Sequence, residues 1–322
     1  MRHKNLIFAL VIAGLVLAMQ PKASAQTYPD RQVRMLIAFP AGGTIDTLGR
    51  ILAQKLSELW GQTVLVENRP GASGNIGAAA AAKAPPDGYT LHLGAQTLAV
   101  NVTILPSKEF DPVKDFEPIM LVATAQDILL VPPNSPFHSV KALIDYAKAH
   151  PGELNYASLG PGTSSHLATV MFADLAGIKL QHVPYLTVSQ MVGDVIAGRI
   201  PVFIPTLGAH VGNVVGGRLR GLAVSGHARS SQLPDIPTFN ELGVKFVDET
   251  SWYVLVAPKG TPKQIIAKVN TDVTRILAMP DVIEKGSKLG YRFVGGPPEK
   301  LAAFLDSEIA KWAELAKHAS LK

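Results

Sequence analysis

Two glycine-rich segments of the chain carry residue types that could bind an anion. The first, Pro40 to Asp46 (PAGGTID), follows the apolar run Val33 to Phe39 and leads into an amphipathic stretch that starts at Thr47. Glycine permits close backbone approach, and the first turn of a helix offers unpaired N–H groups and the positive end of its dipole. The segment therefore predicts an anion site between a strand and a helix.

An ordinary strand-to-helix turn explains this first segment equally well. In that interpretation Asp46 is the N-cap of the following helix, and its carboxylate accepts a backbone N–H. In the other interpretation the same carboxylate accepts a donor from a ligand. The sequence leaves both roles of Asp46 open.

The second segment, Ser158 to His166 (SLGPGTSSH), also lies between a predicted strand and a predicted helix. A single loop of this kind is more often a helix cap, but two such loops in two halves of the chain favour a ligand site. No Lys follows the last Gly, so the segment is not a P-loop. In this segment Thr163, Ser164 and Ser165 combine hydroxyl groups with the N–H groups expected at the start of the helix.

Polar residues after two further predicted strands could contribute to the same ligand site as the two glycine-rich segments. Gln96 and Thr97 follow the strand Thr90 to Leu93, and Thr206 follows the apolar strand Pro201 to Ile204. Loop exposure or an ordinary turn explains each of these residues almost as well. Gln96, Thr97 and Thr206 complete the set of candidate ligand-binding residues.

The sequence argues against catalysis and against a metal centre. The nine His residues include no H-x-x-x-H or H-E-x-x-H pair, and no cluster of Asp or Glu accompanies them. The segment Gly71 to Asn75 departs from the G-x-S-x-G nucleophile elbow at its last position. An exported hydrolase using Ser164 and His166 is the alternative, although neighbours in sequence rarely form a catalytic dyad. We therefore predict no catalytic residue, no metal ligand and no cofactor.

The start of the chain has the pattern of an export signal. Arg2 and Lys4 precede an apolar run from Leu6 to Met19, and Ala23-Ser24-Ala25 forms an A-x-A cleavage pattern. A membrane-spanning helix needs about 20 apolar residues, which is more than this run provides. We predict a signal peptide over residues 1–25 that is removed from a soluble periplasmic protein; a retained anchor is the less favoured alternative.

Composition excludes further classes of protein. The chain has no Cys, so it can form no disulfide, no thiolate metal site and no lipid-modified N-terminal Cys. The leader residues Arg2, Lys4 and Lys22 account for more than half of the formal net charge of +5, and no basic stripe follows them. Nucleic acid is therefore excluded as a partner. Stable membrane insertion is excluded because no second long apolar run appears.

The elements that must position the two loops follow an α/β pattern. Apolar strands at Val33 to Phe39, Thr63 to Glu67 and Thr90 to Leu93 alternate with amphipathic helices, which favours a parallel sheet. A second strand-and-helix set follows a predicted hinge crossing at Pro132-Pro133.

The mature chain is long enough for two lobes, with a ligand cleft between them. We predict that lobe 1 comprises residues 26–126 and 250–322, and that lobe 2 comprises residues 127–249.

The motifs, taken in order, resemble those of a known family. They are YPDRQVRMLIAFPAGGTIDTLGR, VENRPGASGNIGAAAAAKAPPDGYTL, NYASLGPGTSSHL, HVPY, AGRIPVF and LPDIPTFNELG. The sequence resembles the substrate-binding proteins of tripartite tricarboxylate transporters, the TctC or Bug family. The resemblance implies a two-lobed type II periplasmic binding protein fold of the Venus flytrap kind. It also implies that the two glycine-rich loops hold a small organic carboxylate, partly through water, for the membrane permease subunits of a tripartite transporter. The ligand-binding residues that the resemblance implies are Ala41, Gly42, Gly43, Thr44 and Asp46 in the first loop and Ser158, Gly160, Gly162, Thr163, Ser164 and His166 in the second.

The sequence departs from the family pattern at two places near the expected cleft. Leu186 and Thr187 follow HVPY where the family usually has Lys-Gly, and Pro205-Thr206 replace an acidic or amide residue. These departures predict a less polar distal pocket, which favours an aromatic or longer aliphatic acid; a small dicarboxylate is the alternative ligand. A ligand-sensing protein that presents its closed form to a sensor kinase is an alternative output.

Overall fold

The computed structural model describes residues 28–246 and 251–318. The predicted signal peptide and the predicted lobe boundary at residues 249–250 lie outside the described residues. The chain divides into the units Met1–Asp30 and Arg31–Lys322, and every described helix and strand belongs to the second unit.

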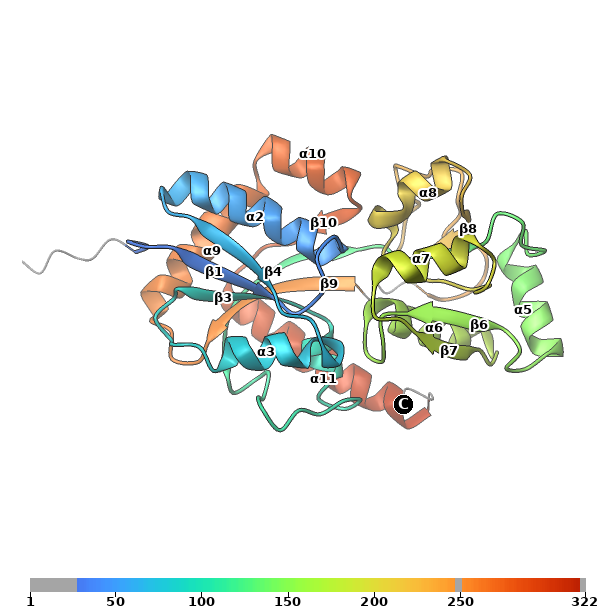
Figure 1. Cartoon of the computed structure of the whole chain (residues 1–322), viewed down its shortest axis with the longest axis horizontal. Coiled ribbons are helices and arrows are strands. Elements are labelled where there is room, and N and C mark those ends of the chain that lie inside the picture. Colours follow the sequence, from blue (N-terminus) through green and yellow to red (C-terminus); the bar gives the residue numbers. More distant parts are fainter. Residues whose placement is uncertain (1–27, 247–250, 319–322) are drawn as a thin grey trace, which may run out of the picture. The chain divides into compact units, whose positions relative to one another are not determined.

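A six-stranded sheet forms the first part of this unit (Figure 1). Its strands, in spatial order, are β10 (Tyr291–Phe293), β4 (Phe116–Ala125), β9 (Ser251–Pro258), β3 (Thr90–Ala95), β1 (Val33–Ile37) and β2 (Val64–Asn68). Strands β1, β2 and β3 are parallel, as the strand-helix alternation predicted, and β9 is antiparallel to both β3 and β4. The sheet as a whole is therefore mixed, with its parallel part formed by the three strands for which parallel pairing was predicted. The chain forms β5 to β8 before it re-enters this sheet as β9. Because no single strand-helix-strand crossover connects β9 to its neighbours, such a connection does not force β9 to be parallel to them.

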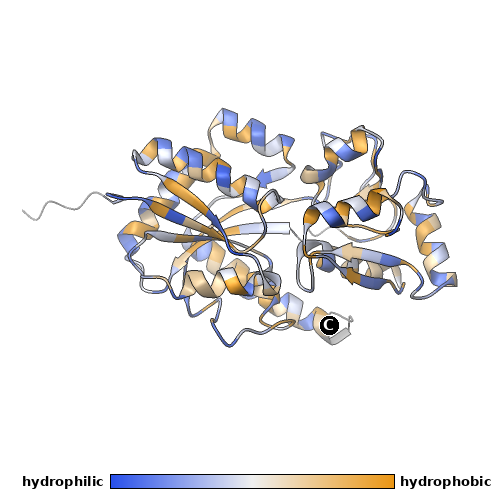
Figure 2. Ribbon diagram, viewed as in Figure 1, coloured by the Kyte–Doolittle hydropathy of each residue, from blue (hydrophilic) through white to orange (hydrophobic). Residues whose placement is uncertain are grey.

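Helices cover both faces of this sheet because its central strands are apolar on both sides. Helices α2 (Thr44–Trp60) and α9 (Lys263–Leu277) pack together on one face. The other face is covered by α3 (Asn75–Ala82), the short α4 (Thr97–Val100) and α11 (Pro298–His318), whose apolar residues share a core with β9. Apolar and polar bands alternate along α2 and along α10 (Pro280–Lys288), as expected of helices with one buried and one exposed face (Figure 2).

The remaining elements form two small sheets with their own helices. Strands β5 (Ile128–Val131) and β8 (Arg220–Val224) pair antiparallel, and β6 (Asn155–Ser158) and β7 (Gln181–Pro184) pair parallel. The helices of this part are α5 (Val140–Ala149), α6 (Ser164–Ala176), α7 (Val188–Ile196), the 3-10 helix η2 (Leu207–His210) and α8 (Val211–Val215).

Two sequence predictions fail in this part. The predicted strand Pro201 to Ile204 forms only isolated bridges, from Val202 to Tyr156 and from Phe203 to Leu130, because its flanking prolines cannot donate to a ladder. The crossing predicted at Pro132-Pro133 is also misplaced. The chain leaves the six-stranded sheet after Ala125 and begins β5 at Ile128, so these prolines follow the crossing.

A buried apolar cluster ties the two sets of elements together. Val100 of α4 and Trp312 of α11 pack with Leu167 of α6, all of them with no exposed surface. Helix α6 carries the second glycine-rich loop at its N-terminus, so this cluster helps to fix that loop in the fold.

Candidate functional site

A cavity brings the two glycine-rich loops together with the ends of β3 and β9 and with helices α7 and η2. Seven of the predicted site residues line it: Gly42, Gly43, Thr44, Gln96, Thr163, Ser164 and Thr206. The other lining residues are Phe39, Pro40, Ile45, Ala95, Leu159, Ser165, Val188, Met191, Phe203, Pro205, Ala209, His210 and Tyr253.

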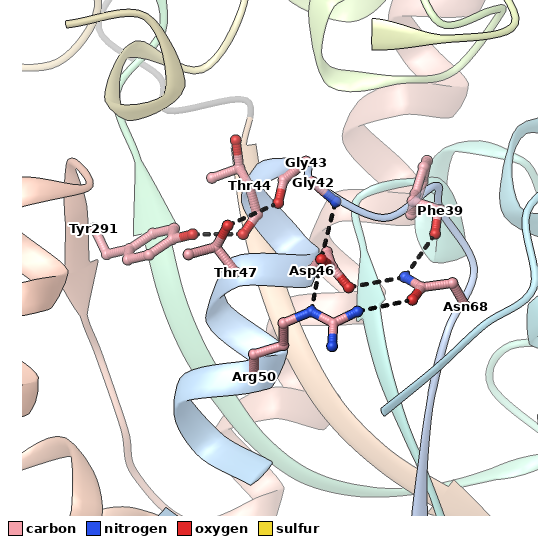
Figure 3. A network of polar contacts seen from close by, with 9 residues as sticks. All are labelled: Phe39, Gly42, Gly43, Thr44, Asp46, Thr47, Arg50, Asn68 and Tyr291. Carbon is pink, nitrogen blue, oxygen red and sulfur yellow. Dashed lines mark hydrogen bonds and ion pairs between the residues drawn. The ribbon is translucent and has the colours of Figure 1, made fainter. Parts of the chain in front are cut away.

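Asp46 does not line the cavity, and its carboxylate holds the first loop through hydrogen bonds (Figure 3). One carboxylate oxygen accepts the Gly42 N–H at 2.9 Å and the Arg50 Nε at 2.9 Å, and the other accepts the Asn68 side-chain amide at 3.0 Å. The same Asn68 amide donates to the Phe39 carbonyl at 3.1 Å, so the loop is tied to the end of β2. Gly43, without a side-chain cap, is the N-cap of α2, so the N-cap interpretation of Asp46 was wrong.

The charge of Asp46 is already satisfied within the protein. Its side chain is almost fully buried. Burial raises the pKa of this carboxyl, but hydrogen bonds from Arg50, Gly42 and Asn68 outweigh it and hold the pKa below its usual value. Asp46 is therefore an ionised positioning group for the loop.

The first turn of α2 presents its backbone to the cavity. Gly42 has a positive φ of 81°, which glycine adopts without strain, and this conformation turns the chain into the helix at Thr44. The Tyr291 hydroxyl donates to the Thr44 carbonyl, and the Thr47 hydroxyl donates to the Gly43 carbonyl at 3.2 Å (Figure 3). These hydroxyls therefore bind the carbonyl groups of the turn. The N–H groups at the start of this 17-residue helix have no intrahelical acceptor.

The second loop is built in the same manner. Gly160 and Gly162 have φ values of 114° and 78°, and the Thr163 hydroxyl donates to the Gly160 carbonyl at 2.7 Å. Thr163 is the N-cap of α6 but makes no side-chain cap, so the first-turn amides of Ser164 and Ser165 are left for the cavity that these residues line. Two uncapped helix N-termini therefore meet at one cavity.

The remaining predicted residues lie beside or behind these loops. Ala41 is exposed next to Gly42, and Thr97 is buried at the start of α4. Gly160 lines an adjoining hollow that shares Phe39, Pro40 and Leu159 with the cavity. Ser158, Gly162 and His166 do not line the cavity; Ser158 Oγ accepts the Gly160 N–H and His166 Nδ1 accepts the Gly162 N–H, so they hold the second loop in shape.

The Ser and His residues of the second loop make no contact that suggests a dyad at the cavity. His166 uses Nδ1 to accept the Gly162 N–H at 3.2 Å, and burial together with nearby His182 lowers its pKa to about 4. Ser158 Oγ lies 2.6 Å from His182 Nε2, but Ser158 is fully buried and does not line the cavity.

The two departures from the family pattern have different structural roles. Thr187 is the N-cap of α7, where its hydroxyl accepts the Gln190 N–H. Leu186 is 90% exposed and lines the adjoining hollow. Pro205 and Thr206 line the cavity itself.

Sequence reasoning missed the apolar wall of the cavity and two of its polar residues. Val188 and Met191 of α7 line it together with Phe203, and their i, i+3 spacing on an amphipathic helix was the available signal. His210 and Tyr253 also line it, and burial lowers the pKa of His210 to about 4 and raises that of Tyr253. Both are therefore neutral near pH 7.

Within the described part of the chain, no group of three or more His, Asp or Glu side chains is placed to hold a metal ion. No helix there combines the length and apolar character needed to cross a bilayer.

Comparisons with known sequences identify the family of this chain. The chain matches the model of the tripartite tricarboxylate transporter family receptor over residues 48–321. A Pseudomonas sp. (strain P51) relative, the UPF0065 protein in the tcbD-tcbE intergenic region, is 37% identical over 95% of this chain and 92% of its own.

Solved structures agree on the fold. Rpa4515 of R. palustris, determined with adipate, has a TM-score of 0.86 and 36% identity, covering 90% of this chain and 97% of its own. The periplasmic binding protein BugD has a TM-score of 0.85 and 31% identity, covering 92% and 99%. The predicted fold class, a two-lobed α/β periplasmic binding protein, is confirmed. The chain belongs to the tripartite tricarboxylate transporter receptor family.

Proposed function

We propose that this protein is exported to the periplasm, binds a small organic carboxylate in the described cavity, and delivers it to the membrane permease subunits of a tripartite transporter. The proposal includes no chemical step: the ligand leaves unchanged. The observation that carries it is the convergence of two uncapped helix N-termini, those of α2 and α6, on one cavity.

These N-termini suit a carboxylate for a physical reason. Each presents N–H donors and about half a positive charge, so an anion is favoured without a cationic side chain. The helices have 17 and 13 residues, long enough for a developed dipole. The family membership and the adipate bound to the related R. palustris protein support the same class of ligand.

Ligand binding between lobes would couple to closure. The first and second glycine-rich loops belong to different lobes if lobe 1 comprises residues 26–126 and 250–322 and lobe 2 comprises residues 127–249. A carboxylate that contacts both loops favours the closed arrangement by its extra contacts, and the permease then recognises the closed form. The signal peptide proposed over residues 1–25 supplies the export route.

A proline scan of the first helical position tests the amide donors. Proline is well tolerated at this position but has no N–H. Thr44→Pro and Ser164→Pro should each weaken carboxylate binding at least tenfold while helix content and melting temperature stay close to the parent. Thr44→Ala separates the hydroxyl from the amide. Lys263→Pro is the matched control, because Lys263 is the exposed first residue of α9, away from the cavity.

Calorimetry on the refolded chain from Gln26 onward, against C3 to C8 carboxylates and aromatic acids, gives the affinities. Absence of binding across that series would contradict the proposed function. Unchanged affinity in both proline variants would instead contradict the role of the helix amides.

A further inference from the structure

We infer that the ligand carries one carboxylate on an apolar body and that the cavity selects against a second carboxylate. The inference rests on the proposed function and specifies the ligand class of the same cavity. Three features of the cavity support it: its apolar wall, its lack of cationic side chains, and the direction of one buried hydrogen-bond chain.

The apolar wall comes from α7, the segment after it and η2. Val188 and Met191 of α7, Phe203, Pro205 and Ala209 all line the cavity. Phe203 is fully buried and Met191 is 3% exposed, so this wall is part of the protein core. An apolar ligand body would contact it without leaving polar groups unpaired, whereas a carboxylate there would lose its hydration.

No Arg, Lys, Asp or Glu is among the described residues that line the cavity. His210 is the one His among them, and its burial keeps it neutral. Two carboxyl groups lie just behind the lining: Asp46 lies behind the first loop, where it pairs with Arg50, and Asp127 accepts a hydrogen bond from Ser251 Oγ. The two helix N-termini are thus the anion-binding groups of the lining. When one carboxylate contacts both of them, a second carboxylate finds neither a free helix N-terminus nor a cation.

The Thr206 hydroxyl is oriented by a buried chain that ends at Asp127. Ser251 Oγ donates to Asp127 Oδ1 at 2.9 Å, so its single proton is used. Thr206 Oγ1 lies 2.8 Å from Ser251 Oγ and must therefore be the donor in that contact. Thr206 then has only acceptor lone pairs left to offer, to the neighbouring Tyr253 hydroxyl and to a ligand in the cavity. They would repel a carboxylate and accept a hydroxyl or N–H donor.

Three six-carbon acids that differ only at the far end test this selection. Hexanoate ends in a methyl group, 6-hydroxyhexanoate in a donor and adipate in a carboxylate. Titration calorimetry with the refolded chain from Gln26 should show both monocarboxylates binding at least tenfold more tightly than adipate. The monocarboxylate and dicarboxylate comparison is repeated at each length from C4 to C8.

A charge placed in the apolar wall should reverse the preference. Met191→Lys should raise the affinity for adipate relative to hexanoate at least tenfold. Gln190→Lys is the matched control, because it adds the same charge on an exposed position of the same helix and should leave the ratio unchanged. Circular dichroism verifies that both variants fold.

The outcomes separate the two levels of the argument. Dicarboxylates that bind as tightly as monocarboxylates of equal length would overturn this inference and leave the proposed function standing. Failure of every carboxylate to bind would overturn both.

Discussion

The substitution Asp46→Asn tests whether this residue positions the first loop or contacts the ligand. The carboxylate accepts three hydrogen bonds, from Gly42, Arg50 and Asn68, at 2.9 to 3.0 Å. An amide has one oxygen, so at least one of these donors would face an N–H₂ group. Losing one hydrogen bond to a buried charged group costs about 2 kcal/mol. Loss of the charge next to Arg50 adds little, because the Arg50 side chain is 55% exposed.

We therefore expect Asp46→Asn to lower the free energy of unfolding by roughly 2 to 3 kcal/mol in urea titrations. Because the loop amides lose their fixed geometry, carboxylate affinity in calorimetry should fall about tenfold, equivalent to ~1.4 kcal/mol. Asp145→Asn, which removes an exposed ion pair with Lys141, is the control and should change stability by less than about 0.5 kcal/mol. Unchanged stability with lost binding would refute the reasoning, because it would mean that Asp46 contacts the ligand directly.

Three further predictions concern the rest of the fold. Burial lowers the pKa values of His92, His166 and His210 from 6.5 to about 4, so they stay neutral in the native state while the unfolded chain takes up protons. The free energy of unfolding should be greatest above pH 6.5 and should fall toward pH 4, by as much as about 4 kcal/mol per pH unit near pH 5. Urea titrations that give the same free energy of unfolding across this pH range would contradict the prediction. A Cβ on Gly208 would lie 1.5 Å from the Leu289 carbonyl oxygen, so Gly208→Ala should force these segments apart and weaken ligand affinity at least tenfold in calorimetry, whereas Gly212→Ala, which meets open space, should not. Glu308 accepts both indole N–H groups of Trp252 and Trp312 at 3.0 Å, so Glu308→Ala should cost about 3 kcal/mol in urea unfolding followed by Trp fluorescence, with ligand affinity retained.

Several features were predictable from local sequence. The apolar run before Gly42 and the amphipathic stretch after it predicted β1 and α2, because buried parallel strands and surface helices have different hydrophobic periods. The same logic located Ser158 to His166 between β6 and α6. Boundaries shifted by up to three residues, as for α2, which begins at Thr44 rather than Thr47. Helix ends and strand ends depend on hydrogen bonds that a pattern does not contain.

Short or context-dependent elements escaped prediction. Strand β10 has three residues and exists because β4 offers it an antiparallel edge. Helix α4 spans only Thr97–Val100, too short to show a helical period. The direction of β9 depends on where the chain returns after the second set of elements, which periodicity cannot indicate.

The sequence by itself determined the ingredients of the site: two glycine-rich strand-to-helix loops with hydroxyl residues, few charges and the motifs of the family. Only the tertiary structure decided how they are used. Asp46 became a loop anchor because Asn68, 22 residues away, reaches its carboxylate. The Thr206 hydroxyl became oriented toward Ser251 because Ser251 is itself hydrogen bonded to Asp127, 124 residues away. Such contacts depend on the long-range packing of strands and loops, and a one-dimensional pattern does not specify it.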